Sequence, residues 1–354
     1  MATRLIVTKN DLADIGVDPD DVSGDVGDGR VRVAIDNFGL TTNNITYALF
    51  GDAMGYWSYF PVGDGSGCVP VWGFGNVVES NSDDVPAGTR LFGYFPMADE
   101  LILEPSGVDD CAFTDASAHR AGLHPWYNRY YRCALDPVWA ADDEDMQAVM
   151  WALFMTGWAL AEQLAASVAS VVVSSASSKT ALSLAWSLRH HDVPMTAVGV
   201  TSAGNRSFVE QAEIYDRVTT YDELDLDRVD GPVAYVDAAG SPGVSERIHI
   251  ALGDRLVDSV MLGATHQGAG AATGDAVGPT PRLFFIPDVA EERAAAEGRN
   301  GYHASFAVAF NEFVPWLRPQ LAIEHGVGVD AVVEAYCALL TGNDGPQAAR
   351  VLSW

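Results

Sequence analysis

Short apolar runs separated by turn residues dominate the first third of the chain. The runs span residues 31–35, 69–74, 90–95 and 101–103, and Gly, Pro, Asp or Asn stands between them. This spacing is typical of β-strands joined by tight connections. The pattern predicts a compact, barrel-like β domain that begins with a strand over residues 1–8, whereas residues 112–140 are predicted to be irregular and are rich in aromatics.

Strand-like and helix-like segments alternate after an acidic cluster at residues 142–145. Negative charge at this point suits the start of a helix, which is predicted over residues 146–166. The alternation predicts right-handed βαβ units and a parallel sheet. Later in the chain, the pattern predicts one more strand and two amphipathic helices. The expected strands are 170–173, 195–200, 233–237, 259–263 and 282–286, and the expected helices are 180–190, 207–214, 302–317 and 329–341.

Composition narrows the class of protein. The 354 residues suffice for two domains, and no apolar run approaches the length of a membrane span. The formal charge of −28 argues against nucleic-acid binding, which needs clustered cations. Lys9 and Lys179 are the only two lysines, so a lysine inside a possible phosphate-binding turn is conspicuous.

The cysteines and the N-terminus bear on the compartment. The four cysteines are scattered without a C-x-x-C pair, so we expect buried thiols in a reducing environment rather than disulfides or a zinc finger. The first residues carry no apolar core of a signal peptide. A cytoplasmic protein is therefore expected.

Residues 171–182 run from an apolar strand through four serines into a helix. An ATP-binding P-loop would need glycine where Val173 and Ser178 stand, although Lys179 and Thr180 match its end. A Ser-x-x-Lys nucleophile is excluded because residue 176 is Ala176. Binding of ATP stays open as a weaker alternative.

A dinucleotide-binding turn needs small residues where a strand meets a helix, so that a pyrophosphate can approach backbone N–H groups. Small residues stand here at Ser175, Ser178 and Ala181. Serine does not freely adopt the backbone angles that glycine supplies, so we expect a turn of different shape. A serine-rich helix start that binds no ligand is the alternative. The residues expected to contact phosphate are Ser175, Ser177, Ser178, Lys179 and Thr180.

The end of the second strand indicates which cofactor would bind. An acidic residue about 20 positions after the turn marks NAD, whereas NADP sites replace it and place Arg nearby. No acid stands here, and the residues expected at the 2′-phosphate are Thr201, Ser202, Asn205 and Arg206. NADP(H) is therefore preferred over NAD(H).

The segments at 155–159, 235–240 and 260–264, together with the order of the elements, resemble the medium-chain dehydrogenase/reductase superfamily. Residues 41–48, 56–60, 70–74 and 174–181 resemble, more narrowly, a subfamily of uncharacterised function. The resemblance implies an α/β protein with a GroES-like β-barrel domain and a Rossmann-type, doubly wound parallel sheet. It places the first domain at residues 1–125 and 290–354 and the second at 126–289.

The sequence differs from the zinc-dependent members of this superfamily in the residues that bind zinc. Zinc alcohol dehydrogenases have Cys in the segment that matches 43–47 and Gly-His-Glu in the segment that matches 72–75, and both are absent here. The four-cysteine lobe is absent too. The closer resemblance is to the zinc-independent quinone and enoyl reductases.

In those reductases a loop that matches residues 43–59 lines the active site. The resemblance implies that Tyr47 is the proton donor or oxyanion partner and that Asn44 orients it. Tyr56 is the second candidate for this role. The alternative is that these aromatic residues only fill the interior of the domain. Gly263 would lie beside the nicotinamide. His266 would lie nearby, but a lone histidine is more often structural.

The function expected from the sequence is NADP(H)-dependent, zinc-independent reduction of a small carbonyl or α,β-unsaturated compound. The aromatic residues at 124–131 favour a substrate with an apolar or aromatic face. The resemblance also implies a homodimer. A binding or regulatory protein without redox activity, on the same fold, is the alternative.

Overall fold

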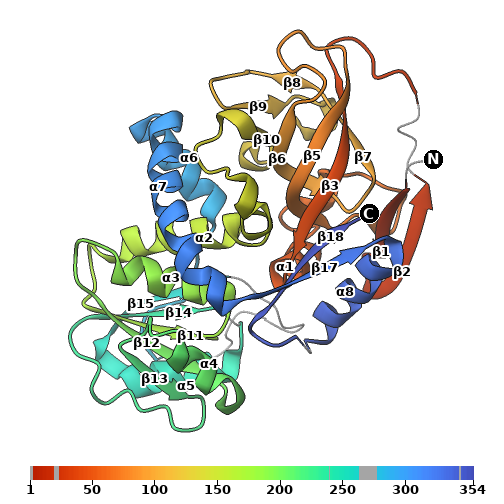
Figure 1. The fold of residues 1–354 in the computed structure, drawn as a ribbon. Helices are drawn as coiled ribbons and strands as arrows, with labels where there is room; N and C mark the ends of the chain where they lie inside the picture. The colour runs from red at the N-terminus through yellow and green to blue at the C-terminus, as the bar shows by residue number, and fades with distance from the viewer. Residues whose placement is uncertain (1–2, 20–23, 239, 263–276, 343) are drawn as a thin grey trace. The chain divides into compact units, whose positions relative to one another are not determined.

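The computed structural model describes residues 3–19, 24–238, 240–262, 277–342 and 344–354. The chain forms two compact units (Figure 1). The first unit comprises Met1–Trp151 and His303–Trp354, and the second comprises Ala152–Tyr302. The sequence suggested domain boundaries after residues 125 and 289, and both lie earlier in the chain than the boundaries of the two units. Residues 126–151 group with the first unit, in part because one of its strands runs through them.

A nine-stranded, mostly antiparallel sheet forms the centre of the first unit, beside a three-stranded sheet. The large sheet has the order β17-β18-β3-β5-β6-β10-β9-β8, with β7 on β3, and the small sheet has the order β2-β1-β4. All strands predicted in the first third are present. The bounds are β1 Thr3–Thr8, β2 Asp11–Pro19, β3 Val31–Leu40, β4 Ser66–Gly67, β5 Pro70–Ser80, β6 Arg90–Pro96, β7 Glu100–Leu103, β8 Pro105–Ser106, β9 Ala112–Asp115, β10 Arg129–Arg132, β17 Ala322–Val327 and β18 Ala348–Ser353.

The stretch predicted to be irregular, residues 112–140, is only partly so. It contributes β9 and β10, which pair with each other, and β10 also pairs with β6. The 3₁₀ turns η2 (Ala118–Arg120) and η3 (Pro125–Asn128) connect the two strands. Aromatic residues of this stretch therefore lie against the sheet.

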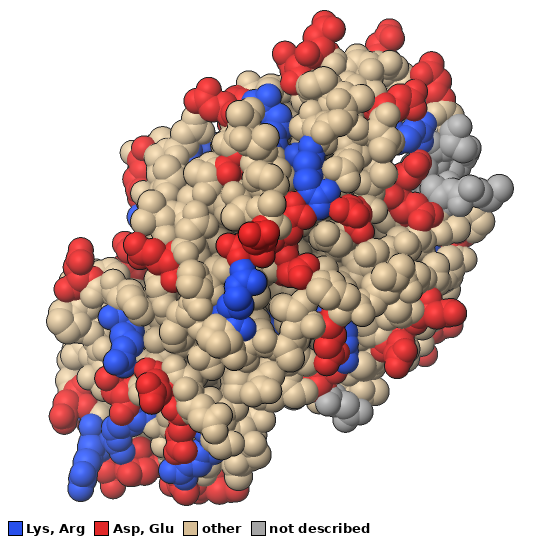
Figure 2. Space-filling view, viewed as in Figure 1, with Lys and Arg blue, Asp and Glu red and all other residues tan. Residues whose placement is uncertain are grey.

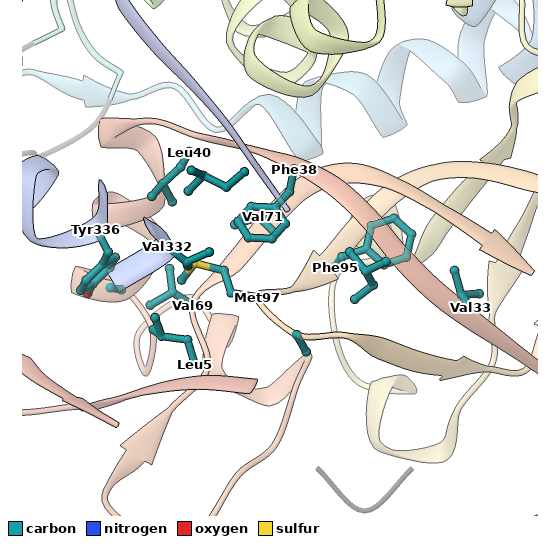
Figure 3. Packing of buried hydrophobic residues seen from close by; sticks show 14 of the residues in the cluster. Leu5, Val33, Phe38, Leu40, Val69, Val71, Phe95, Met97, Val332 and Tyr336 are labelled. Carbon is teal, nitrogen blue, oxygen red and sulfur yellow. The ribbon is translucent and has the colours of Figure 1, made fainter. Parts of the chain in front are cut away.

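Helix α8 (Val329–Thr341) completes the core of the first unit. Its buried residues, at positions 332, 335, 336 and 339, recur at the spacing of one helix face. Figure 3 shows Val332 and Tyr336 of this face beside Leu5 of β1 and Val69. Each fully buried aliphatic side chain here contributes roughly 1.5–3 kcal/mol by leaving water.

A six-stranded parallel sheet forms the second unit, in the order β13-β12-β11-β14-β15-β16. Numbered from the first strand of this unit, the order is 3-2-1-4-5-6, that of a dinucleotide-binding fold. Every residue of β11 is buried, as expected for a central parallel strand. The bounds are β11 Ser170–Ser174, β12 Thr196–Thr201, β13 Arg217–Thr220, β14 Val233–Asp237, β15 Leu256–Met261 and β16 Arg282–Leu283.

The helices agree with the sequence pattern except at a few places. The strand expected over residues 282–286 ends at Leu283, and helix α6 begins at Ile286. In the second unit, helices α5 and α6 and strand β13 were not predicted. The bounds are α2 Glu144–Leu164, α3 Lys179–Arg189, α4 Arg206–Gln211, α5 Pro242–Leu252, α6 Ile286–Glu297 and α7 Arg299–Leu317.

Gly157 of α2 allows this helix to approach α3 closely. A Cβ atom at this position would lie 2.5 Å from the backbone nitrogen of Leu184 and 2.9 Å from its Cα atom. Backbone atoms cannot move aside as a flexible side chain can. The glycine is therefore a packing requirement between the two helices.

Acidic residues are spread over the face shown in Figure 2 rather than gathered into one patch, and Lys and Arg lie among them. None of the helices among the described residues is long and apolar enough to cross a membrane. All four cysteines are free thiols. Three are buried as expected, but Cys337 is exposed.

Candidate functional site

The serine turn connects β11 to α3 in the second unit. Ser178 is the N-cap of α3, and its Oγ accepts a hydrogen bond from the Ala181 N–H at 3.3 Å. Ser175 has φ of 51°, in the left-handed region that favours glycine. The expectation that serine would give the turn a different shape is therefore wrong at this position. Serine adopts the angle instead, at a cost of roughly 1–2 kcal/mol.

Neighbouring loops engage the turn through hydrogen bonds. The Ser175 N–H donates to the Tyr221 hydroxyl at 2.9 Å, and the Ser177 Oγ accepts from Asn205 Nδ2 at 3.0 Å. The structure thus brings the predicted residues Ser177 and Asn205 together, although 28 positions separate them. Tyr221, which follows β13, was not predicted, and its partner lies far away in the sequence.

Asp237 ends β14, the neighbour of β11 on the other side, and is buried. Its carboxylate accepts hydrogen bonds from the Ser174 Oγ at 2.9 Å, the Ser245 Oγ at 2.8 Å and the Gly240 N–H at 2.9 Å. The carboxyl ends of β11 and β14 are therefore linked where the strand order reverses. Ligands of doubly wound sheets bind at this kind of position.

The residues expected at a 2′-phosphate lie at the end of β12 and directly after it, but the cation among them, Arg206, is already paired. The Arg206 guanidinium donates from Nε to Glu210 at 2.8 Å and from Nη1 to both carboxylate oxygens of Glu223 at 2.9 Å. Thr201 is buried at the end of β12. Ser202 is half-buried. Two carboxylates thus stand where a phosphate was expected.

Gly263 and His266 lie outside the described residues.

In the first unit, the segment expected to be a loop, residues 43–59, contains helix α1 (Thr42–Leu49) and the 3₁₀ turn η1 (Tyr56–Ser58). Asn44 forms a capping box at the start of α1. Its Oδ1 accepts from the Thr41 N–H at 2.7 Å, and its Nδ2 donates to the Pro70 carbonyl at 2.8 Å. Both ends of the Asn44 amide therefore have structural partners.

Tyr47 is buried, with 4% of its surface exposed, and its hydroxyl accepts a hydrogen bond from Trp72 Nε1 at 3.1 Å. Burial raises the pKa of Tyr47 well above its usual value, while hydrogen bonds with Trp72 and Asn43 act in the opposite direction. The side-chain partners of Tyr47 are thus Trp72 and Asn43, rather than the predicted Asn44. A phenol that accepts these bonds can direct its own proton to another acceptor.

Tyr47 and four other tyrosines pack together, and we call the five the tyrosine cluster. Ring centroids lie 4.8 Å apart for Tyr47 and Tyr56 and 4.7 Å apart for Tyr94 and Tyr127. The Tyr56 and Tyr127 hydroxyls are 3.1 Å apart, and burial raises the pKa of Tyr56 to about 12. The members are Tyr47, Tyr56, Tyr59, Tyr94 and Tyr127.

The cluster unites two aromatic segments that the sequence showed separately, one before residue 60 and one near residue 127. It also includes Tyr94, whose position in a predicted strand gave no sign of this role. Among the described residues, no group of three or more His, Cys, Asp or Glu side chains could hold a metal ion. What the first unit offers is a set of buried phenols next to indole rings.

The fold is similar to that of several solved structures. CurA from Vibrio vulnificus, solved in complex with NADPH, has a TM-score of 0.62 at 13% identity over 99% of this chain and 98% of that one. A mutant enoyl thioester reductase from Candida tropicalis has a TM-score of 0.60 at 12% identity, over 100% and 99%. A putative NADPH:quinone reductase from Bacillus thuringiensis has a TM-score of 0.57 at 11% identity, over 100% and 99%.

These likenesses show a GroES-like domain joined to a Rossmann-type domain. The chain belongs to the family described as "Protein of unknown function (DUF2855)", which matches residues 38–344. No curated protein matches the sequence.

Proposed function

We propose that the protein is an NADP(H)-dependent, zinc-independent oxidoreductase that reduces a small carbonyl or α,β-unsaturated compound. One observation carries the proposal: Ser175 adopts the left-handed angle of a glycine at the point where β11 turns into α3. A residue is held in such a strained conformation only when the surroundings require it, and strain of this kind gathers at ligand sites.

Two features of the turn suit a dinucleotide: its residues are small, and it lies where the strand order of the parallel sheet reverses. Ser175, Ser177 and Ser178 would contact the pyrophosphate, together with Lys179 and Thr180 at the start of α3, where helix N–H groups favour anions. Bound NADPH would supply a hydride. The protein supplies orientation and a proton.

Tyr47 is the proposed proton donor. Its pKa lies above its usual value, so the phenol keeps its proton at neutral pH. Hydrogen bonds from Trp72 and Asn43 stabilise the phenolate that remains after the proton has left. Tyr56, whose hydroxyl is hydrogen-bonded to that of Tyr127, is the second candidate for the proton donor. The aromatic rings that pack against Tyr47 favour a substrate with an apolar or aromatic face.

Isothermal titration calorimetry with NADPH and with NADH tests the cofactor. We expect NADPH to bind and a Ser175→Val variant to lose at least about tenfold in affinity, because a β-branched residue strongly resists φ near 51°. Ser175→Gly is the matched control and should bind NADPH as the wild type does. Absence of binding by either nucleotide would refute the proposed function.

A binding or regulatory protein without redox activity is the second candidate, and two contacts favour it. The Tyr221 hydroxyl already accepts the Ser175 N–H that a phosphate would need. Arg206 is paired with Glu210 and Glu223, which would repel a 2′-phosphate. In a Tyr221→Phe variant the N–H is released, so NADPH should bind more tightly if the enzyme proposal holds. Equal, undetectable binding in both proteins would favour the second candidate.

We further propose a homodimer that forms through the edge of the parallel sheet. Strand β16 is the last strand in the order, and Leu283 on it is 53% exposed. Val257 and Met261 of the neighbouring β15 are also exposed, so apolar side chains line this edge. Light scattering after size exclusion should give twice the chain mass, and a Leu283→Arg variant should be monomeric. A monomeric wild type would refute the dimer.

A further inference from the structure

Two fully buried polar side chains of α2 have no hydrogen-bonding partner among the described protein groups. Neither Oε1 nor Nε2 of Gln147 is bonded, and the Trp151 Nε1–H is unbonded as well. Gln147 is 0% exposed and Trp151 is 1% exposed. Buried polar groups are almost always paired, so three unpaired atoms one helical turn apart require an explanation.

These groups lie beside the tyrosine cluster. The Trp151 ring is 4.6 Å from Trp72, the residue that donates to the Tyr47 hydroxyl. Tyr94, whose hydroxyl is also buried and unpaired, lies 5.1 Å from the same Trp72 ring. An unpaired indole N–H and an unpaired hydroxyl thus belong to two rings that pack against Trp72, the donor to the proposed proton donor.

We propose that Gln147 and Trp151 form a binding subsite for an amide-like group on an aromatic ligand. The Gln147 amide offers a donor and an acceptor side by side, and the Trp151 N–H adds a second donor. This set is complementary to a carboxamide, whose oxygen accepts from the two donors while its N–H donates to Gln147 Oε1. The flat rings of Trp72 and Trp151 suit an aromatic body.

If Gln147 had a purely structural role, its amide would be expected to have hydrogen-bonding partners within the protein. Asn44, which has a structural role, is equally buried, and both ends of its amide are hydrogen-bonded. An unpaired amide at position 147 destabilises the ligand-free protein, and a methionine of similar shape would remove that penalty. Destabilising polar groups are retained at sites that serve function.

Trp126 packs against the same two indole rings. Its ring is 5.1 Å from Trp72 and 5.2 Å from Trp151, and it lies on the short turn η3 rather than in a strand.

The first test compares stabilities without ligand. We expect Gln147→Met to raise the melting temperature by about 2–4 °C, since it removes an unpaired buried amide. Asn44→Leu is the matched control, and its melting temperature should fall because its partners lose their bonds. A Gln147→Met variant that melts at or below the wild-type temperature would show that the amide is satisfied structurally, for example by bound water, and would overturn the proposal.

The second test uses three probes of similar size without nucleotide: benzamide, benzoate and toluene. Benzamide should raise the melting temperature of the wild type more than benzoate, which lacks the donor, and more than toluene, which lacks both groups. The benzamide effect should vanish in Gln147→Met. Equal shifts with all three probes, or an unchanged benzamide shift in the variant, would overturn the subsite.

As a substrate site this subsite rests on the proposed function, but its test does not use NADPH. Absence of nucleotide binding together with selective benzamide binding would refute the reductase and leave the subsite standing. NADPH binding without selectivity for benzamide would refute the subsite and leave the reductase proposal standing.

Discussion

An Arg120→Met variant should strongly destabilise the first unit. The Arg120 and Asp115 side chains are each 1% exposed, and Arg120 Nε lies 3.0 Å from Asp115 Oδ2. The two atoms are close but not aligned for a hydrogen bond, so their attraction is mainly ionic. The guanidinium also lies 4.9 Å from the centre of the Phe60 ring and donates to the Tyr130 hydroxyl at 3.3 Å.

The expected loss of stability follows from the charge that stays buried in the variant. Removal of Arg120 leaves the Asp115 carboxylate without its counter-ion, and the loss of one member of a buried pair costs about 3–5 kcal/mol. The carboxylate keeps the Ser117 N–H and the Glu104 N–H as donors to Oδ1, which favours the lower part of this range. A methionine in place of Arg120 preserves most of the packing, so the lost charge dominates.

Urea unfolding followed by tryptophan fluorescence measures this loss, because most of the nine tryptophans lie in the first unit. A double-mutant cycle with Asp115→Asn isolates the pair. Since the double variant buries no unpaired charge, it should be more stable than the sum of the two single losses predicts, by about 2 kcal/mol. A loss below about 1 kcal/mol in Arg120→Met, or strict additivity in the cycle, would refute the reasoning.

Three other predictions concern pH, packing and turnover. The folded protein holds Tyr56 neutral up to a pKa of about 12, against 10.0 for an ordinary tyrosine, so its contribution is constant below pH 10 and is lost as the pH rises to 12. The part of the loss due to Tyr56 is about 2–3 kcal/mol in urea titrations, and Tyr56→Phe should lose that much less stability than the wild type over this pH range. Gly157→Ala should lower the melting temperature, although alanine usually favours a helix, because the new Cβ meets backbone; a higher melting temperature would contradict this packing. Trp72→Phe removes the donor to Tyr47 and should slow NADPH-dependent turnover roughly 10- to 100-fold. Trp126→Phe, which leaves that donor in place, is the control, and equal rates in the two variants would exclude a role for the Trp72 N–H.

Much of the fold could be predicted from local pattern. The buried valines of β11, the cap at Ser178 and the acidic start of α2 each act within a few residues, so the sequence indicated their elements nearly to the residue. The two-unit organisation followed from the change of hydrophobic period near residue 142. Helix α1 was missed because its cap depends on Asn44, whose amide also needs the distant Pro70 carbonyl.

The position of the serine turn could be predicted from the sequence, whereas the choice of Tyr47 as proton donor came from the resemblance to the reductases and stays a prediction. The tertiary structure decided how each is held. The left-handed angle of Ser175 coincides with a contact to Tyr221, 46 positions away, and Trp72 and Asn43 are the partners of Tyr47. Propensity and periodicity reflect neighbours along the chain, whereas the identity of a hydrogen-bonding partner depends on which distant segments pack together. For the same reason, only the structure could show that the amide of Asn44 is paired and that of Gln147 is not.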